Sequence, residues 1–314
     1  MRILVVGAGA IGGYFGGRLL EAGRDVTFLV RPERSRRLAE TGLVIRSGFG
    51  DVSLPAPPTV TADTLRKRFD LVLLSCKAYD LEGAIAGFAP AVGPDTVILP
   101  VLNGMRHFDR LDQQFGAGRV LGGLVLISSA LDPEGRIQHC NKMHGLVFGD
   151  RDGSRSARVE ALATALSGAG FDARLSEGIL QELWEKWVFI ASLAAINCLL
   201  RATVDDIVTS GSTGLALTVM AECAGIAAGQ GYPPGEACLQ RIRAMLTTPG
   251  VALAASMLRD LERNAPIEAD HVIGDLLRRG DPQPGAQPVL RIAYAHLKAY
   301  EARRAREAGL AKAE

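Results

Sequence analysis

The sequence predicts an α/β fold in which a domain with a parallel sheet is followed by an all-α domain. In the first half of the chain, short continuous apolar runs alternate with helical segments, which is typical of a parallel sheet covered on both faces. After about Gly178 the strand patterns stop, and long segments with a 3.6-residue apolar period follow. We therefore expect two domains, at residues 1–176 and 177–314.

The first domain is expected to contain four parallel strands and three added β regions. The parallel strands are predicted at Ile3–Val6, Val26–Val30, Leu71–Ser75 and Val97–Leu102. The last of these should end close to Pro100, because proline cannot donate to a central ladder. The added regions are a hairpin within Gly42–Val60, an antiparallel pair at Val120–Ala130 and Ile137–Phe148, and a final strand at Phe171–Leu175.

The second domain is expected to be helical throughout, with helices near residues 178–200, 211–230, 234–247, 251–263, 266–279 and 288–308. Its longest apolar stretch, Trp187–Leu200, is shorter than the ~20 residues that cross a bilayer as a helix. We interpret it as a buried core helix. The first strand follows Met1-Arg2 directly, so we expect no signal peptide.

Charge and cysteine content exclude several classes of protein. The chain has 35 Lys and Arg against 34 Asp and Glu, a net charge of +1 that provides no global field for nucleic acid or an anionic membrane. The five cysteines form no CxxC pair and are too few for a disulfide scaffold. We expect a cytoplasmic protein with neither a nucleic-acid nor a membrane partner.

A glycine-rich turn follows the first strand and precedes a helix. Its residues 7–12 read G-A-G-A-I-G, namely Gly7, Ala8, Gly9, Ala10, Ile11 and Gly12. In such a motif the first glycine allows the tight turn, the second lets the backbone approach a pyrophosphate, and the third lets helix and strand pack closely. The strand–turn–helix context predicts a Rossmann-type dinucleotide-binding domain.

The residue after the second strand predicts which dinucleotide is bound. An acidic residue there would hold the ribose 2′-hydroxyl of NAD. This strand is followed by Arg31, with Arg34, Arg36 and Arg37 nearby. Because a guanidinium suits a 2′-phosphate, we favour NADP(H) over NAD. A solvated basic helix start is the alternative for most of this cluster.

Two polar residues follow the later parallel strands. Lys77 comes after Leu71–Ser75, and Asn103 comes after Val97–Leu102. The carboxyl ends of parallel strands open onto the ligand crevice of such folds. An exposed charge at a strand end and an ordinary Asn-Gly turn are equally good interpretations of these two residues taken alone.

Taken together, these motifs resemble those of the ketopantoate reductases (2-dehydropantoate 2-reductases). The resemblance covers essentially the whole chain and also includes Lys186 in E-L-W-E-K-W, Ser256 in A-S-M-L and Glu268 in P-I-E-A-D. It implies NADPH-dependent reduction of a 2-oxo acid, 2-dehydropantoate, to the 2-hydroxy acid pantoate, as in pantothenate biosynthesis. It also implies that Lys77 and Asn103 lie at the nicotinamide end of the cofactor site, with Asn103 binding substrate as well.

The resemblance makes Lys186 the proton donor, and the sequence sets this residue apart independently. Lys186 is the only charged residue between Glu185 and Arg201, on an otherwise apolar helix. Partial burial lowers the pKa of a lysine toward neutrality, which suits proton donation to a carbonyl oxygen. A lysine that snorkels from the helix start is the alternative.

Two residues further along the chain complete the site that the resemblance implies. Glu268 would orient the substrate or Lys186, and Ser256 would hydrogen-bond the substrate. Glu268 is also explained as a carboxylate in the first turn of a helix started by Pro266, where the helix dipole favours it.

The pattern departs from the family at two positions on the Lys186 helix. The family has asparagines four and eight residues after its lysine, whereas this chain has Ile190 and Ala194. Asn197 lies ~16 Å along the helix from Lys186, too far to substitute for them. A reductase of a different, more apolar 2-oxo acid therefore stays open, as does an NADPH-binding sensor without turnover.

The remaining candidates are weaker. His139, Cys140 and His144 have no further carboxylate or thiol ligand in their segment, so no metal site is predicted. His107, just beyond Asn103, is either at the edge of the active site or a surface residue at the start of a helix, and we favour the surface position. The last helix packs on its own domain or forms a homodimer, and the sequence does not choose.

Overall fold

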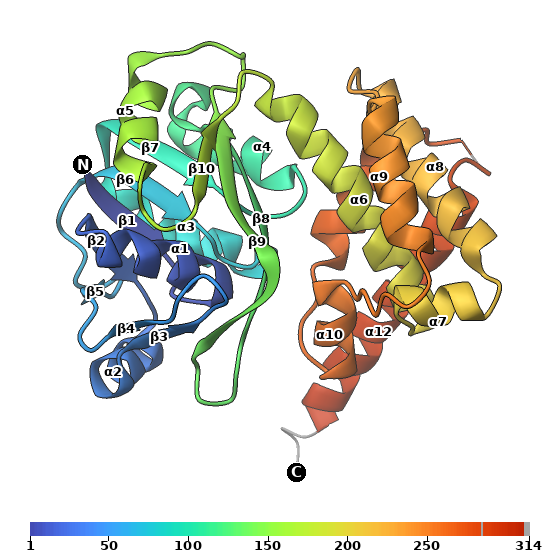
Figure 1. Ribbon diagram of the computed structural model, residues 1–314, viewed down its shortest axis with the longest axis horizontal. Coiled ribbons are helices and arrows are strands. Elements are labelled where there is room, and N and C mark those ends of the chain that lie inside the picture. The colour runs from blue at the N-terminus through green and yellow to red at the C-terminus, as the bar shows by residue number, and fades with distance from the viewer. Residues whose placement is uncertain (284, 311–314) are drawn as a thin grey trace. The chain divides into compact units, whose positions relative to one another are not determined.

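The computed structural model describes residues 1–283 and 285–310 and divides into two compact units. The first unit comprises residues 1–102 and 107–179, and the second comprises residues 103–106 and the chain from residue 180 onward. The first is an α/β unit and the second is helical (Figure 1), which confirms the predicted fold class. The domain boundary near residue 176 stays a prediction.

A five-stranded parallel sheet forms the centre of the first unit, in the order β5-β2-β1-β6-β7. Its strands are β1 (Arg2–Val6), β2 (Asp25–Leu29), β5 (Thr59–Val60), β6 (Phe69–Leu74) and β7 (Val92–Pro100). The four predicted parallel strands are confirmed, and the last ends at Pro100 as expected. Because β2 and β6 lie on opposite sides of β1, the turn after β1 lies where the strand order reverses, which is where such sheets bind ligands.

A second sheet has the order β10-β9-β3-β4, and β8 pairs with β9. Its strands are β3 (Leu43–Arg46), β4 (Val52–Leu54), β8 (Gly122–Leu131), β9 (Ile137–Gly149) and β10 (Asp172–Leu175). The hairpin β3–β4 and the antiparallel pair β8–β9 are confirmed. The end of the predicted hairpin region was wrong, because Thr59–Val60 joins β2 in the first sheet. Pro55, Pro57 and Pro58 cannot donate to a ladder and end the hairpin before this strand.

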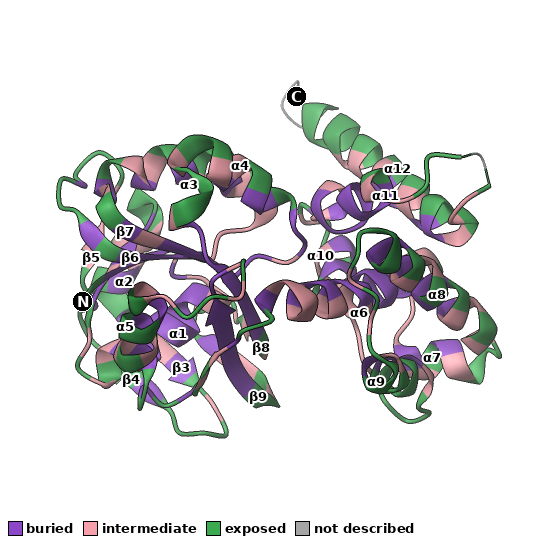
Figure 2. Cartoon of the chain, turned by 90° about the horizontal axis from the view of Figure 1, so that it is seen from above, coloured by how far each residue is buried: buried purple, intermediate pink, exposed green. Residues whose placement is uncertain are grey.

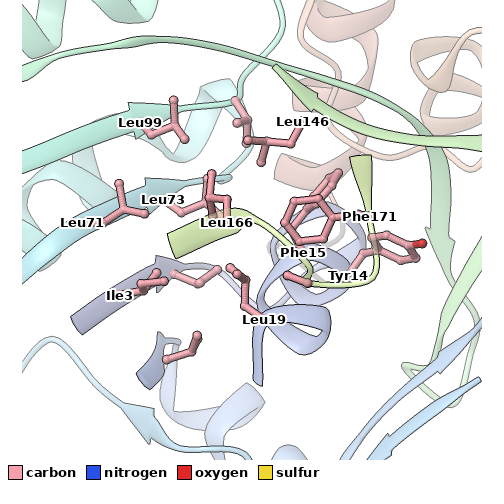
Figure 3. Packing of buried hydrophobic residues seen from close by; sticks show 14 of the residues in the cluster. Ile3, Tyr14, Phe15, Leu19, Leu71, Leu73, Leu99, Leu146, Leu166 and Phe171 are labelled. Carbon is pink, nitrogen blue, oxygen red and sulfur yellow. The ribbon is translucent and has the colours of Figure 1, made fainter. Parts of the chain in front are cut away.

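Helix α1 (Ala10–Glu21) lies between the two sheets, and its glycines allow this. A Cβ at Gly16 would lie 2.5 Å from the ring of Phe28 in the parallel sheet. A Cβ at Gly17 would lie 2.9 Å from Cδ1 of Ile45 in the second sheet. Figure 3 shows Phe15 of α1 among core side chains from both sheets and from Phe171, whose ring meets it edge-on at 5.0 Å.

The other helices of the first unit cover its surface, and in Figure 2 their outer faces are exposed while the strands are largely buried. They are α2 (Pro32–Thr41), η1 (Ala78–Asp80), α3 (Leu81–Phe88), η2 (Ala89–Ala91), α4 (Arg106–Phe115), η3 (Ala117–Arg119) and α5 (Ala157–Leu166).

The second unit is built from α6 (Ile179–Leu200), α7 (Val204–Thr209), α8 (Thr213–Gly229), α9 (Glu236–Thr247), α10 (Ser256–Glu262), the π-helical turn η4 (Asp270–Gly274), α11 (Asp275–Arg279) and α12 (Pro288–Leu310). Two predictions need correction. Helix α7 was not expected and is stabilised by a capping box between Thr203 and Asp206. The helix predicted over 251–263 begins only at Ser256.

Helix α6 is long and apolar enough to cross a membrane by length and composition alone. However, 67% of its most apolar 18-residue window is buried inside the structure, and core helices pass the same test. This burial supports the prediction of a core helix.

Candidate active site

The glycine turn after β1 has a separate structural reason for each of its three glycines. Gly7 has φ +94°, a conformation that favours glycine. A Cβ at Gly12 would lie 2.1 Å from the backbone oxygen of Gly7 and 2.2 Å from Oγ of Ser75. A Cβ at Gly9 would meet no protein atom within 4 Å. Gly7 therefore makes the turn, Gly12 allows close packing, and Gly9 faces open space that a ligand can approach.

The start of α1 suits an anionic ligand. Gly9 is the N-cap, and no side chain caps this helix end. The first amides of a helix lack intrahelical acceptors and carry the positive end of the helix dipole, so they favour a phosphate. The residues around Ala8, Ala10 and Ile11 thus fit the pyrophosphate of a dinucleotide.

The arginines after β2 have different roles. Arg34 donates from Nε and Nη2 to the backbone oxygen of Ala8, at 3.1 and 3.0 Å, and thereby braces the glycine turn. Arg37 donates to the backbone oxygen of Pro133. The side chain of Arg31 is 76% exposed and lies 2.5 Å from Oδ1 of Asp80. Of these three arginines, Arg31 is thus the one held at the surface by a carboxylate, which the sequence interpretation did not foresee.

Lys77 follows the strand that lies next to β1 in the sheet, although it is far from the glycine turn along the chain. This strand is β6, and Lys77 is the N-cap residue of η1. Oγ of Ser75 donates to the backbone oxygen of Val6 at 2.9 Å, which ties the end of β6 to the end of β1. Lys77 is partly buried.

The second unit brings Lys186 and Glu268 together. Lys186 lies in the second turn of α6, and burial lowers the pKa of its ammonium to about 8, while the carboxylate of Glu268 opposes this shift. The helix expected to contain Glu268 in its first turn begins at Ala269, so Glu268 precedes it. The backbone oxygen of Glu268 accepts from the amides of His271 and Val272, at 3.2 and 2.9 Å. Glu268 therefore fixes the start of this helix with its backbone while its carboxylate acts on Lys186.

The segment around Glu268 is held by side chains from two long helices. From α6, Nε1 of Trp187 donates to the backbone oxygen of Val272 at 2.8 Å. From α12, the hydroxyl of Tyr294 donates to Oδ1 of Asp270 at 2.6 Å. The hydroxyl of Tyr300 donates to the backbone oxygen of Ala265 at 2.8 Å. Sequence reasoning missed these residues, because only the fold brings them to Glu268.

Asn103 belongs to the second unit, although the chain on both sides of residues 103–106 belongs to the first. The adjoining Gly104 closely approaches His271, which lies three residues after Glu268. His271 was not singled out from the sequence, although its position next to the P-I-E-A-D motif was a signal. The structure thus places Asn103 in the same unit as Lys186 and Glu268.

Ser256 is exposed at the first turn of α10. The preceding residue is tied to α6, because Oδ1 of Asn197 accepts from the amide of Ala255 at 2.9 Å. Nδ2 of Asn197 donates to the backbone oxygen of Ala202 at 2.8 Å. The amide of Asn197 is thus engaged at both ends, which makes it a structural link between α6 and α10.

The helix face after Lys186 is apolar. Ile190 is partly buried and Ala194 is buried. Ser192, between them, is fully buried and donates to the backbone oxygen of Val188 at 2.7 Å.

The histidines of the first unit have partners other than a metal. The ring of His144 is hydrogen-bonded to the hydroxyl of Tyr14 at 3.0 Å, and His139 to Ser47 at 2.8 Å. Among residues 1–283 and 285–310, no group of three His, Cys, Asp or Glu residues is arranged to hold a metal ion.

The expectation that His107 lies at the surface was wrong, because its side chain is fully buried on the face of α4 that also carries Phe108.

Sequence models of one family match both units. The model described as "Ketopantoate reductase PanE/ApbA" matches residues 3–153, and the one described as "Ketopantoate reductase PanE/ApbA C terminal" matches residues 178–301. The uncharacterized oxidoreductase YkpB of Bacillus subtilis (strain 168) is 40% identical over 303 residues, which cover 96% of this chain and 99% of the relative.

Solved structures share the fold over nearly the whole chain. The crystal structure of 2-dehydropantoate 2-reductase from Methylococcus capsulatus has a TM-score of 0.83 and 29% identity, and covers 97% of this chain and 98% of its own. The ternary structure of D-mandelate dehydrogenase with NADH and anilino(oxo)acetate has a TM-score of 0.87 at 22% identity, with coverage of 97% and 99%. At that identity the second likeness shows the fold alone.

Proposed function

Because the chain belongs to the ketopantoate reductase (PanE/ApbA) family, and is therefore an oxidoreductase with a nicotinamide cofactor, we propose that it reduces 2-dehydropantoate to pantoate with NADPH. The observation that carries this proposal is that the second unit brings Lys186, on the apolar helix α6, together with the carboxylate of Glu268, while burial lowers the pKa of the lysine to about 8. A lysine with such a pKa gives up its proton far more readily near neutral pH than an ordinary one.

In the proposed mechanism, the bound cofactor supplies the hydride that reaches the carbonyl carbon of the substrate. Lys186 donates a proton from Nζ to the carbonyl oxygen, where negative charge develops. Glu268 keeps Lys186 protonated before the reaction, because its carboxylate favours the ammonium form. Asn103 and Ser256 hydrogen-bond the substrate and orient its carbonyl group.

The first unit has the features that fit the cofactor. The open space at Gly9 and the uncapped start of α1 accommodate the pyrophosphate, and Lys77 lies beyond the neighbouring strand. We assign the 2′-phosphate of NADP(H) to Arg31, because its side chain is exposed whereas Arg34 and Arg37 are engaged with backbone oxygens. In this assignment the phosphate replaces Asp80 as the partner of Arg31. Replacing Arg31 with Ala should raise the KM for NADPH and leave that for NADH unchanged, and an equal change in both would remove this assignment.

The test of the proposed reaction is a panel of 2-oxo acids assayed by the loss of NADPH absorbance. A kcat/KM for 2-dehydropantoate well above that for every other acid supports the proposal. Ile190 and Ala194 make the face beside Lys186 apolar and favour a second candidate, a reductase of a more apolar 2-oxo acid. Higher kcat/KM for acids with branched or aromatic side chains would establish the second candidate instead.

A third outcome separates an enzyme from a sensor. Tight NADPH binding without oxidation across the panel would identify a binding protein without turnover.

A cytoplasmic location and a homodimer through the helical unit remain predictions. The mass of the protein in solution tests the homodimer.

A further inference from the structure

The turn that carries Asn103 closely approaches His271. A Cβ at Gly104 would lie 2.8 Å from the backbone oxygen of His271, 3.1 Å from Cδ2 of its ring and 3.5 Å from Nε2. Gly104 also has φ +74°, so a side chain there would be strained in addition to being crowded. The turn can take this position only because residue 104 is a glycine.

A hydrogen bond links the two segments as well. The pKa of the His271 ring is lowered mainly by burial and also by Arg106. It is raised by the carboxylates of Glu268 and Asp275 and by a hydrogen bond to the Asn103 backbone. A bond that raises the pKa of a histidine favours the protonated ring, so the ring is the donor and the Asn103 carbonyl the acceptor. The net pKa shift is downward, and the neutral ring still has one N–H for this bond.

We propose that His271 is a positioning residue that fixes Asn103 relative to Lys186 and Glu268. The close approach of Gly104, the bond to the Asn103 backbone and the placement of residues 103–106 in the second unit all support this. Since His271 is only 6% exposed, it acts through Asn103 rather than on the substrate.

The proposal deepens the proposed function and rests on it, because the position of Asn103 affects the rate only if the substrate binds beside Lys186. In sequence, Asn103 follows β7 of the first unit. Through His271, its backbone is instead held by the helix that begins after Glu268. The proton donor and the substrate-binding amide are thereby fixed on one body.

Two substitutions of His271 in the full chain distinguish the effect of its hydrogen bond to the Asn103 backbone from the effect of its ring. His271→Phe keeps a ring but removes the donor, and we expect kcat to fall about tenfold, which corresponds to ~1.4 kcal/mol. The Kd for NADPH should stay within about twofold of the wild-type value, since the glycine turn and Arg31, to which we assign the phosphates of the cofactor, lie in the first unit. His271→Asn restores a donor and should recover part of kcat.

A matched control comes from α12 of the same unit. His296 is partly buried, and its Nε2 has no hydrogen-bond partner in the part of the chain that the structure describes. His296→Phe should leave kcat unchanged. Wild-type kcat in His271→Phe, or an equal loss in both Phe variants, would overturn the proposal.

A double-mutant cycle tests whether the effect passes through Asn103. In an Asn103→Ala background, His271→Phe should lower kcat by less than about twofold, because the side chain that it positions is gone. A full tenfold loss in that background would show that His271 acts independently of Asn103.

Hydrogen exchange gives a readout that needs no turnover. We expect the backbone amides of residues 104–106 to exchange about tenfold faster in His271→Phe, because their anchor is removed. Unchanged exchange would contradict the inference even in an active enzyme. If the wild-type protein reduces no acid in the panel, the proposed function fails, while this measurement still decides whether His271 holds the turn.

Discussion

The glycine turn of the first unit is shaped by its own backbone, whereas the Glu268 segment of the second unit is shaped by side chains that reach it from distant helices. The turn depends on the φ angle of Gly7 and the missing Cβ of Gly12. The segment depends on Trp187 and Tyr294. The difference matches the two tasks that we propose for these regions, since phosphate binding needs unpaired backbone amides, whereas proton transfer needs a side chain whose pKa is tuned by its surroundings.

Lys186→Ala should give the largest difference between the two regions, because it should affect turnover and not cofactor binding. This substitution removes the proposed proton donor, so kcat should fall by about 10³-fold. The Kd for NADPH, measured by fluorescence, should stay within about twofold of the wild-type value, because the glycine turn and Arg31, to which we assign the phosphates of the cofactor, lie in the first unit. Normal turnover by the variant would rule out Lys186 as the proton donor.

Within the glycine turn, two alanine substitutions should have different effects. Gly12→Ala places a Cβ 2.1 Å from the Gly7 oxygen, so we expect a loss of ~1–3 kcal/mol in unfolding free energy together with loss of cofactor binding. Gly9→Ala adds a Cβ in open space, so thermal unfolding should be nearly unchanged while the Kd for NADPH rises about tenfold or more. Equal destabilisation by both changes would contradict separate roles for these glycines.

The pH dependence tests the electrostatic coupling of Lys186 and Glu268. Because only the protonated lysine can donate, kcat should fall as the pH rises through about 8. Glu268→Gln removes the carboxylate that raises the pKa of Lys186, so the alkaline limb of the profile should move to lower pH. A limb that stays in place or moves to higher pH would show that Glu268 does not act on Lys186 in this way.

The smallest expected effect is at the α12 anchor. Tyr294→Phe removes the hydroxyl that donates to Asp270, which should cost ~1 kcal/mol of unfolding free energy and lower kcat a few-fold by loosening the Glu268 segment. Calorimetry and steady-state kinetics measure both effects. Tyr300→Phe, which frees the oxygen of Ala265, is the matched variant from the same helix. Unchanged kcat in both variants would show that Glu268 needs no support from α12.

These regions also differ in how far their sequence predicts them. The order of strands and helices, the tight turn at Gly7 and the close packing at Gly12 could be predicted, because they depend on local patterns and on the lack of a Cβ. The position of Thr59–Val60 could not, since strand pairing is decided by partners far along the chain. His107 was misplaced because a polar residue on a buried helix face is not distinguished by type alone.

The candidate site shows the same limit. Lys186 was noticeable as a lone charge on an apolar helix, but the size of its pKa shift depends on its burial and on Glu268, more than 80 residues later. Asp80 beside Arg31 and His271 beside Gly104 are pairs made by the fold. No spacing rule connects them, because their distance in sequence carries no information about their contact.

The buried helix α6 also has a consequence for how the protein is made. Its bonds to Ala255 and Val272 involve residues that are translated more than 50 residues after α6 ends at Leu200. At ~5–20 residues per second, the ribosome needs several seconds to supply them. During that time the apolar helix lacks these partners, and apolar surface that is exposed in this way favours aggregation of the unfinished chain.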